Sequence, residues 1–462
     1  MCLQAVNYMP STSEVVHFRF PREYRPSIIA AMATLKATRL RIYPTPEQEQ
    51  AMLRIAGCCR LVYNLALEQR RDFWRQHRRK TGTAISWFSQ KRELPALKAA
   101  APFLSEAPAH CLQMALKDLD TAYDRFFSGL GGYPRPRRKG EGDSFTFPDP
   151  GQIRIDVAKK RLILPKFGRR ATDAGALRIR LHRGLYGALR RVTISREGRH
   201  WYASVLMRTK RNPPRLAAPV AASDVIGLDR NVAAPVVASD GRRFGCVIEG
   251  PRERSRQRRL ARSLSRKCRG SKRRQKARLR LLAHKSRMAR RRRDMIHKIT
   301  TDIAKNHRVV VIEKLRVLAM TASAHGTAEA PGRNVAQKAG LNRAILDVGW
   351  GEIRRQLAYK LAWRGGLLLE VAARDTSRSC AACGHVDAAS RASRDMFRCT
   401  ACGHEDDADV NAAIEIRRRG LIALGLPPAG TVGAARGALC DSMARNREKK
   451  NDGINLPAPA GR

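Results

Sequence analysis

The chain has 462 residues, and its 91 lysines and arginines outnumber its 40 aspartates and glutamates by 51. This charge excess, with a pI near 11.3, excludes an ordinary metabolic enzyme and indicates a polyanionic partner. Because duplex nucleic acid carries two phosphates per base pair, about 25 base pairs would neutralise the surplus. Hydrophobic residues make up 43% of the chain, which excludes global disorder and allows about two to four domains.

Neither a membrane segment nor a secreted protein is predicted. No uncharged apolar run reaches the ~18 residues needed to cross a bilayer, and the N-terminus lacks the basic and apolar regions of a signal peptide. We therefore expect a cytosolic protein with no membrane partner. In this reducing compartment, the 11 cysteines do not predict a disulfide framework.

The N-terminal half begins with residues 1–34, which have no hydrophobic periodicity and are expected to form a loose tail. A strand is predicted at 35–43. After it, Thr45, Pro46 and Gln48 supply an N-cap, a proline at the first helical position and a capping-box glutamine. Helical periodicity then continues to about residue 130, which predicts a helical domain.

The hydrophobic period becomes two between residues 145 and 209. Arg191-Val-Thr-Ile-Ser and Trp201-Tyr-Ala-Ser-Val-Leu alternate apolar and polar residues, and Glu197-Gly198 between them is a hairpin signal. These patterns predict a small β-barrel or meander, completed by the strand at 35–43.

The second half of the chain alternates strands with helices. Three strands come first, and a long basic helical segment separates them from a fourth, apolar strand. A helix, another strand, a cysteine cluster and a final helix follow, which is the order expected of an RNase H-like α/β fold. The predicted strands are 225–229, 235–239, 244–248, 309–312 and 367–371. The predicted helices are 252–306, which Gly270-Ser271 divides into two, 342–363 and one from 409.

Cys380-Ala-Ala-Cys383-Gly and Cys399-Thr-Ala-Cys402-Gly form two CxxC knuckles with 15 residues between them. Each knuckle can bring two thiolates to one ion, and two knuckles complete a tetrahedral site. We predict one structural zinc ion bound by Cys380, Cys383, Cys399 and Cys402, because four sulfur ligands leave no open catalytic position. The alternatives are disulfides, which a reducing cytosol disfavours, and a redox CxxC, which does not come in pairs.

Three acidic residues stand at the ends of predicted core elements. Asp229 and Glu313 each end a strand, and Asp409 opens the last helix. Adjacent strands with a helix packed on them could bring the three carboxylates to one sheet edge, where they could hold two Mg²⁺ ions about 3.5–4 Å apart for phosphodiester hydrolysis. Each acid taken singly can also be a cap or a salt-bridge partner. The residue pattern alone therefore leaves a nuclease and a structural interpretation open.

Four segments resemble the RuvC and zinc-ribbon signature of the TnpB/OrfB family, whose members are encoded by insertion sequences and are similar to small type V CRISPR effectors. The resemblance spans about residues 35 to 420. Asn231 departs from the family pattern, because glycine commonly stands two residues after the first aspartate. The matching segments are Ile226-Gly-Leu-Asp229, Val309-Val-Val-Ile-Glu313-Lys-Leu, Thr376-Ser-Arg-Ser-Cys380-Ala-Ala-Cys383-Gly-His and Asp407-Ala-Asp409-Val-Asn411-Ala-Ala.

The resemblance implies an RNA-guided DNA endonuclease of the prokaryotic cytosol. Its guide RNA would derive from the element end and pair with target double-stranded DNA beside a short flanking motif. Asp229, Glu313 and Asp409 match the three catalytic, Mg²⁺-binding RuvC carboxylates, and Asp407 is the rival for the third position. The alternatives are a nucleic-acid-binding regulator that does not cut, and a DNA transposase or recombination protein that acts without a guide RNA.

Half of the residues from 252 to 293 are cationic, 21 out of 42, and Glu253 is the single acid among them. A solvated helix face is the usual interpretation of a charged run, but this density favours binding to a polyanion. We predict that the segment lines a channel for a guide–target heteroduplex or a displaced strand. The residues expected to contact nucleic acid are Arg258, Arg259, Arg262, Lys272, Arg273, Arg274, Arg290, Arg291, Arg292 and Arg293.

A shorter basic run follows Tyr133, whose ring, with that of Phe145, could stack on the bases of a nucleic acid strand. A flexible basic linker is the alternative interpretation of this run, which consists of Arg135, Arg137, Arg138 and Lys139.

The fold class expected overall is multidomain α+β: an N-terminal β-barrel of the wedge type with an inserted helical domain, then an RNase H-like (RuvC) α/β domain with an inserted zinc ribbon. The expected boundaries are a tail at 1–34, a barrel at 35–45 and 145–212, a helical recognition domain at 46–144, a nuclease domain at 222–375 and 407–420, a zinc ribbon at 376–406 and a disordered tail at 421–462.

Overall fold

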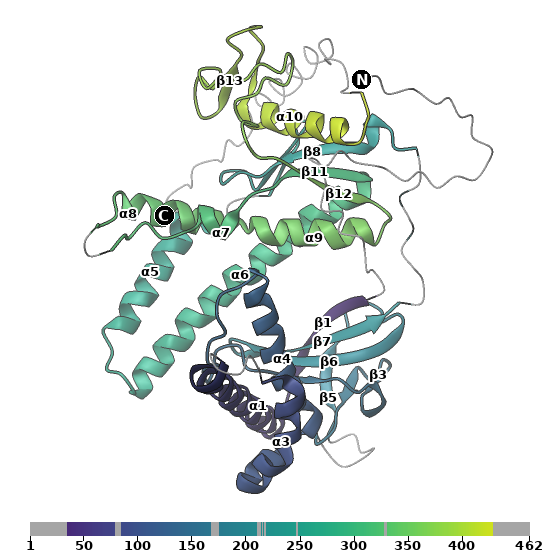
Figure 1. The fold of residues 1–462 in the computed structure, drawn as a ribbon, viewed down its shortest axis with the longest axis vertical. Helices are drawn as coiled ribbons and strands as arrows, with labels where there is room; N and C mark the ends of the chain where they lie inside the picture. The colour runs from purple at the N-terminus through teal and green to yellow at the C-terminus, as the bar shows by residue number, and fades with distance from the viewer. Residues whose placement is uncertain are drawn as a thin grey trace, which may run out of the picture. The chain divides into compact units, whose positions relative to one another are not determined.

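The computed structural model describes residues 35–427 except 79–84, 168–174, 210–213, 215, 217–218, 246–247 and 328–329. The tail predicted at 1–34 lies outside the described residues, as does the part beyond residue 427 of the tail predicted at 421–462. The chain divides into two compact units, each described by itself (Figure 1). The N-terminal unit comprises residues 32–213 and 249–291, and the C-terminal unit comprises residues 214–248 and those from 292 onward.

The N-terminal unit contains a curled seven-stranded antiparallel sheet in the order β2-β6-β7-β1-β5-β4-β3. The strand predicted at 35–43 is β1 and lies between β7 and β5. In the described part of the chain the end strands β2 and β3 do not pair with each other, so the sheet is not closed by that pairing. The strands are β1 (Leu35–Tyr43), β2 (Ser144–Phe147), β3 (Arg154–Asp156), β4 (Arg161–Ile163), β5 (Leu177–Arg180), β6 (Ala188–Glu197) and β7 (His200–Arg208).

Helices of the same unit pack on this sheet and share its hydrophobic core. The capping box predicted for the first helix is confirmed, because the Gln48 backbone N–H donates to Thr45 Oγ1 at 3.3 Å and the Thr45 N–H donates to Gln48 Oε1 at 3.1 Å. The unit also holds a basic helical hairpin. The elements are α1 (Pro46–Phe73), the π-helical turn η2 (Trp74–Arg78), α3 (Trp87–Ala100), α4 (Ala109–Phe127), α5 (Pro251–Ser265) and α6 (Lys272–Asn306), of which the last continues into the C-terminal unit.

The C-terminal unit is built on a five-stranded sheet in the order β10-β9-β8-β11-β12. Strands β8, β11 and β12 are parallel, whereas β9 and β10 are antiparallel to their neighbours. The bounds are β8 (Val225–Asp229), β9 (Val236–Ala238), β10 (Arg243–Phe244), β11 (Val309–Glu313) and β12 (Leu367–Val371). Strand β10 is shorter than the predicted 244–248, of which residues 246–247 lie outside the described part.

Both faces of this sheet are covered by helices, which explains why its parallel strands are almost continuously apolar. Alternate residues of β11 point to opposite faces: Val309 and Val311 join the core under α10, and Val310 and Ile312 join the core of α6, α8 and α9. Figure 1 shows α10 and α9 on opposite sides of the sheet. The helices are α7 (Val317–Met320), α8 (Val335–Val348), α9 (Trp350–Ala362) and α10 (Ala408–Ala423).

Two predicted helix boundaries were wrong. The single helix expected at 342–363 is two helices, because Gly349 has a left-handed φ of 78° that ends α8 and starts α9 in a new direction. The last helix continues to Ala423, past residue 421 at which the disordered tail was expected to begin, since Leu421 and Leu424 are buried against the sheet.

None of the helices in the described ranges is both long and apolar enough to span a membrane.

Helix α10 crosses β8 so closely that only a glycine fits at position 227. A Cβ on Gly227 would lie 2.1 Å from the Ala413 carbonyl oxygen and 2.5 Å from the Arg417 backbone nitrogen. Because backbone atoms cannot rotate away as a flexible side chain can, this contact fixes how closely α10 approaches the sheet.

We expect Gly227→Ala to destabilise the protein by about 1–3 kcal/mol or more, because α10 would have to shift off β8. The control is Gly340→Ala in α8, where an added Cβ meets no atom within 4 Å. That change should stabilise the protein by about 0.5–1 kcal/mol through helix propensity. Urea unfolding of both variants measures the two effects, and equal effects would contradict the proposed steric constraint.

Candidate catalytic metal centre

Asp229, Glu313 and Asp409 are brought to one edge of the C-terminal sheet. Asp229 and Glu313 are the last residues of β8 and β11, which are parallel neighbours paired through Leu228 and Ile312. The carboxyl ends of parallel neighbours lie at the same sheet edge. Asp409 is in the first turn of α10, which packs across β8.

The three carboxylates repel one another in a buried site. Burial, together with the charges of Glu313 and Asp409, raises the pKa of Asp229 to about 7. Glu313 and Asp409 are themselves buried, at 7% and 8% exposed. Clustered carboxylate oxygens are the ligands that Mg²⁺ prefers, and a cation would relieve this repulsion. The donor chemistry of the site therefore fits a divalent metal, although the three side chains do not all approach within 4.8 Å of one another.

Asp407 and Asp409, the two candidates for the third RuvC carboxylate, have different surroundings. Asp407 is the N-cap of α10, because its Oδ1 accepts from the backbone N–H groups of Asp409 and Val410, both at 3.1 Å. Its other oxygen accepts from Arg243 Nη2 at 2.6 Å. Asp407 is thus occupied in holding the helix end, and Asp409 is the acid whose charge acts on Asp229.

Two residues that sequence reasoning did not include hold Asp409. The Asn231 amide donates to Asp409 Oδ1 at 2.6 Å, while its own Oδ1 accepts from the Ala233 backbone N–H at 3.1 Å. This second bond fixes the direction of the amide. Arg243 Nη1 lies 3.6 Å from Asp409 Oδ2. The signal for Asn231 was available, since it stands where the resembling family commonly has glycine; nothing in the sequence pointed to Arg243.

Glu313 also has partners that the sequence did not reveal. The Thr376 hydroxyl donates to Glu313 Oε1, and the Arg230 guanidinium donates to the Glu313 backbone carbonyl. Arg230 is 5% exposed, and burial lowers its pKa from the ordinary value. These contacts fix Glu313 and place a buried cation beside the acidic cluster.

We expect Asp229→Asn to stabilise the metal-free protein in a pH-dependent way. Because the folded-state pKa of Asp229 is raised from 3.8 to about 7, the wild-type protein loses stability as pH rises between these values. The gain on substitution should therefore be small at pH 4.5 and reach about 4 kcal/mol at pH 8. Chemical unfolding in EDTA at both pH values measures it.

The control for this prediction is Asp302→Asn, an exposed aspartate of α6 in the same unit. This substitution should not give the large gain at pH 8, because Asp302 lies outside the acidic cluster. A pH-independent gain for Asp229→Asn would show that the carboxylate at 229 is not under electrostatic strain.

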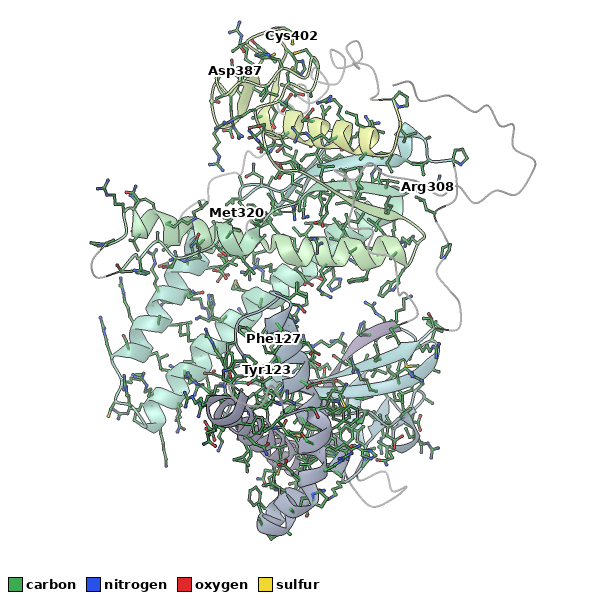
Figure 2. All side chains as sticks on the ribbon, in the orientation of Figure 1. Tyr123, Phe127, Arg308, Met320, Asp387 and Cys402 are labelled. Atoms are coloured by element: carbon green, nitrogen blue, oxygen red, sulfur yellow. The ribbon has the colours of Figure 1, made fainter. Side chains whose placement is uncertain are left out.

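The four predicted zinc ligands form a compact cluster. The Sγ atoms of Cys380, Cys383, Cys399 and Cys402 all lie within 4.8 Å of one another. In the described part of the chain, no other set of three or more His, Cys, Asp or Glu side chains comes this close. Figure 2 shows Cys402 in this ribbon, which contains β13 (Met396–Arg398) and β14 (Glu405–Asp407).

The two knuckles have the same backbone geometry. In each, the first cysteine N–H donates at 2.8 Å to the carbonyl of the histidine after the knuckle, His385 or His404. The intervening glycine has a left-handed φ, 79° at Gly384 and 71° at Gly403, and its N–H donates back to the first cysteine. The repeated turn explains the glycine after each second cysteine. The histidines contribute their backbone to these turns and are not in the thiol cluster.

The ribbon is attached directly to the helix that carries Asp409. The Asn411 amide of α10 donates to the Ser379 carbonyl and accepts from the Ala381 N–H, both at 2.9 Å. Asn411 is fully buried, and Cys380 and Cys399 share a small core with Phe397 and Ala408. The order of the ribbon is thus coupled to the start of α10.

Cys399→Ser should reduce bound zinc from about one ion per chain to nearly none and lower the thermal unfolding temperature, because so small a core cannot hold the ribbon without its metal. Elemental analysis and thermal unfolding are the measurements. Cys268→Ser is the control, since Cys268 is an exposed thiol outside the cluster, and it should change neither quantity. Full zinc content in Cys399→Ser would contradict the ligand assignment.

The cations of the basic hairpin have two different roles. Arg274 donates to the carbonyls of Leu264 and Lys267, at 3.1 and 2.7 Å, and so closes the turn between α5 and α6. Arg291 and Arg292 are paired with Glu253 and Asp347. One face of α5, in contrast, lines a cavity of about 660 Å³ that contains no acid. This α5 face consists of Ser255, Arg258, Arg259, Arg262 and Ser263 in α5 and of Arg266 and Lys267 just after its end.

Three family models match separate parts of the chain. Residues 32–80 match the "Helix-turn-helix domain" of OrfB_IS605, residues 204–324 match the OrfB_IS605 "Probable transposase", and residues 350–416 match the "Cas12f1-like, TNB domain". A curated relative, the Escherichia coli (strain K12) protein named "Putative RNA-guided DNA endonuclease InsQ", is 38% identical over 84% of this chain and 93% of its own length. The chain belongs to the TnpB/OrfB family.

Two further comparisons agree with this membership of the TnpB/OrfB family. A Streptomyces pristinaespiralis protein named "Putative RNA-guided DNA endonuclease" is 32% identical, and the match covers 76% of this chain and 81% of that one. Among solved structures, a Cas12f1 chain from a complex with sgRNA and target DNA superposes with a TM-score of 0.51 at 14% identity, covering 83% of this chain and 98% of the other. The expected multidomain fold that combines helices and sheets is confirmed at the level of this similarity to a Cas12 effector.

Proposed function

We propose that this TnpB/OrfB protein is an insertion-sequence-associated, RNA-guided DNA endonuclease that hydrolyses phosphodiester bonds with Mg²⁺. The observation that carries the proposal is the buried cluster of Asp229, Glu313 and Asp409 at one sheet edge. The names of the two relatives support the RNA-guided activity. The proposed partners are a guide RNA from the element end and double-stranded DNA with a short flanking motif.

The proposed division of labour follows the two units. The C-terminal unit would be the RuvC-like nuclease, with an inserted ribbon that binds one structural zinc ion. The curled sheet of the N-terminal unit would form the wedge-type barrel, and its helices would bind the guide and inspect the flanking motif. The α5 face supports a role in binding phosphates, because seven adjacent cationic or hydroxyl residues line it without an acid.

The catalytic Mg²⁺ would be held by the carboxylates of Asp229, Glu313 and Asp409, and substitution of Asp229 tests this assignment. When bound, Mg²⁺ supplies positive charge at the reacting phosphate and makes water more acidic. Asn231 would hold Asp409 in one orientation, and Thr376 would do the same for Glu313. Because these side chains are fixed before substrate binds, little reorganisation is needed during the reaction.

Purification of the protein from its native locus should recover a discrete RNA that maps to the adjacent element end. With this RNA, the protein should cleave a matching DNA in Mg²⁺, and Asp229→Ala should reduce cleavage at least about 10³-fold while the RNA stays bound. Sequencing of the RNA and a plasmid cleavage assay measure the two parts. Asp302→Ala is the matched control and should cleave normally.

Each part of the proposal can be contradicted by a separate experimental result. Undiminished cleavage by Asp229→Ala would overturn the carboxylate assignment. Cleavage of arbitrary DNA without RNA would overturn the guided mechanism in favour of a transposase-like activity. Binding of RNA and DNA without any cleavage by the wild type would favour a regulator.

A further inference from the structure

An aromatic cavity of about 380 Å³ lies within the helical part of the N-terminal unit. Its walls come from the end of α1 and η2, from α4, and from the loop after α4. We propose that this aromatic pocket binds an unpaired nucleobase of a nucleic acid strand whose phosphates lie on the adjacent cations. This inference depends on the proposed function in one respect only, namely that the protein binds nucleic acid. The residues on which the argument rests are Arg70, Trp74, Tyr123, Phe126, Phe127 and Tyr133, and the cavity is also lined by Phe73, Ile85, Asp120 and Asp124.

The rings of this aromatic pocket pack against one another edge-on and in parallel. Tyr133 stands edge-on to Tyr123 and to Phe126, with centroids 5.7 and 5.3 Å apart. Tyr123 and Phe127 are stacked with centroids 6.1 Å apart, and Figure 2 shows both on α4. Phe127 is 67% exposed, Trp74 51% and Tyr133 45%. Large aromatic surface left in water at one place indicates a binding site.

The polar groups of the pocket are already fixed to one another. Arg70 donates to Asp120 at 3.1 Å and to Gln90 at 3.0 Å, and its guanidinium lies 5.3 Å from the Tyr123 ring centroid. The Tyr123 and Tyr133 hydroxyls are hydrogen-bonded at 3.0 Å. The walls are therefore rigid before a ligand arrives, which lowers the entropy cost of binding.

The loop that carries Tyr133 is anchored, which contradicts the flexible-linker interpretation. Asn64 makes two hydrogen bonds to the Arg137 backbone, at 2.8 and 3.1 Å. The Arg137 side chain pairs with Asp118 at 2.9 Å and lies 4.0 Å from the Tyr63 ring. Arg137 is thus structural, and Phe145 is buried in the sheet core, so neither is available for nucleic acid as the sequence suggested.

The remaining cations of the loop identify the class of ligand. Arg135, Arg138 and Lys139 are exposed and directly follow Tyr133, and Arg125 is exposed on α4 beside the pocket residues. Aromatic faces next to such a cationic run match the requirements of a single strand, whose bases stack and whose phosphates bind cations. A duplex does not fit, because its bases are already stacked on one another.

The test uses the full-length protein and fluorescent 12-nucleotide single strands of RNA and of DNA. Tyr133→Ala with Phe127→Ala should weaken binding by about 5- to 150-fold, since both stacking faces are lost. Tyr133→Phe keeps the ring but loses the hydroxyl bond to Tyr123, so it should weaken binding by less than the double variant. Phe88→Ala is the matched control, because Phe88 is an exposed aromatic of α3 outside the pocket, 61% exposed. Comparison of the RNA and DNA strands identifies which of them the pocket prefers.

Photo-crosslinking followed by peptide mass spectrometry gives the second readout. Crosslinks from the single strand should map to residues 123–133 and disappear in the double variant, while a duplex of the same sequence should give none there. Unchanged affinity and an absence of crosslinks at 123–133 would overturn the pocket assignment. Neither measurement requires cleavage. An absence of nuclease activity would therefore contradict the proposed function without deciding whether the pocket binds a nucleobase.

Discussion

The structure of the C-terminal unit depends on keeping three like charges together in a buried place. Desolvation and mutual repulsion raise the pKa of Asp229 to about 7, so the cluster opposes folding in the absence of a bound metal ion. The parallel pairing of β8 with β11 fixes two of the acids, and the close crossing of α10 over Gly227 fixes the third. The two apolar cores on either side of the sheet stabilise the fold and offset the unfavourable free energy of the acidic cluster.

The ribbon and the acidic centre are mechanically linked through one side chain. Asn411 lies two residues after Asp409 in α10 and makes both of its hydrogen bonds to the backbone beside Cys380. The start of α10 is thus held from three sides, by the ribbon, by the Asp407 cap and by the sheet. A metal ion bound by the four cysteines would therefore also restrain the helix that carries Asp409.

The net charge of the chain overstates the surface available to a polyanion. Arg70, Arg137 and Arg274 are held by hydrogen bonds or ion pairs and act within the fold. The α5 face and the loop after Tyr133, in contrast, carry adjacent cations without an acid among them. Local pairing, rather than the sum of charges, therefore selects where phosphates can bind.

The sequence alone determined the features that depend on local geometry. CxxC spacing predicted the thiol cluster because each knuckle is one turn, and strand-end acids predicted the carboxylate cluster because parallel strands end at one edge. Only the tertiary structure showed that Asp407 caps α10, joined Asn231 to Asp409 across 178 positions, and folded Tyr133 against α4. Such contacts depend on how separate elements pack, and no sequence periodicity encodes the direction of a side chain toward a distant partner.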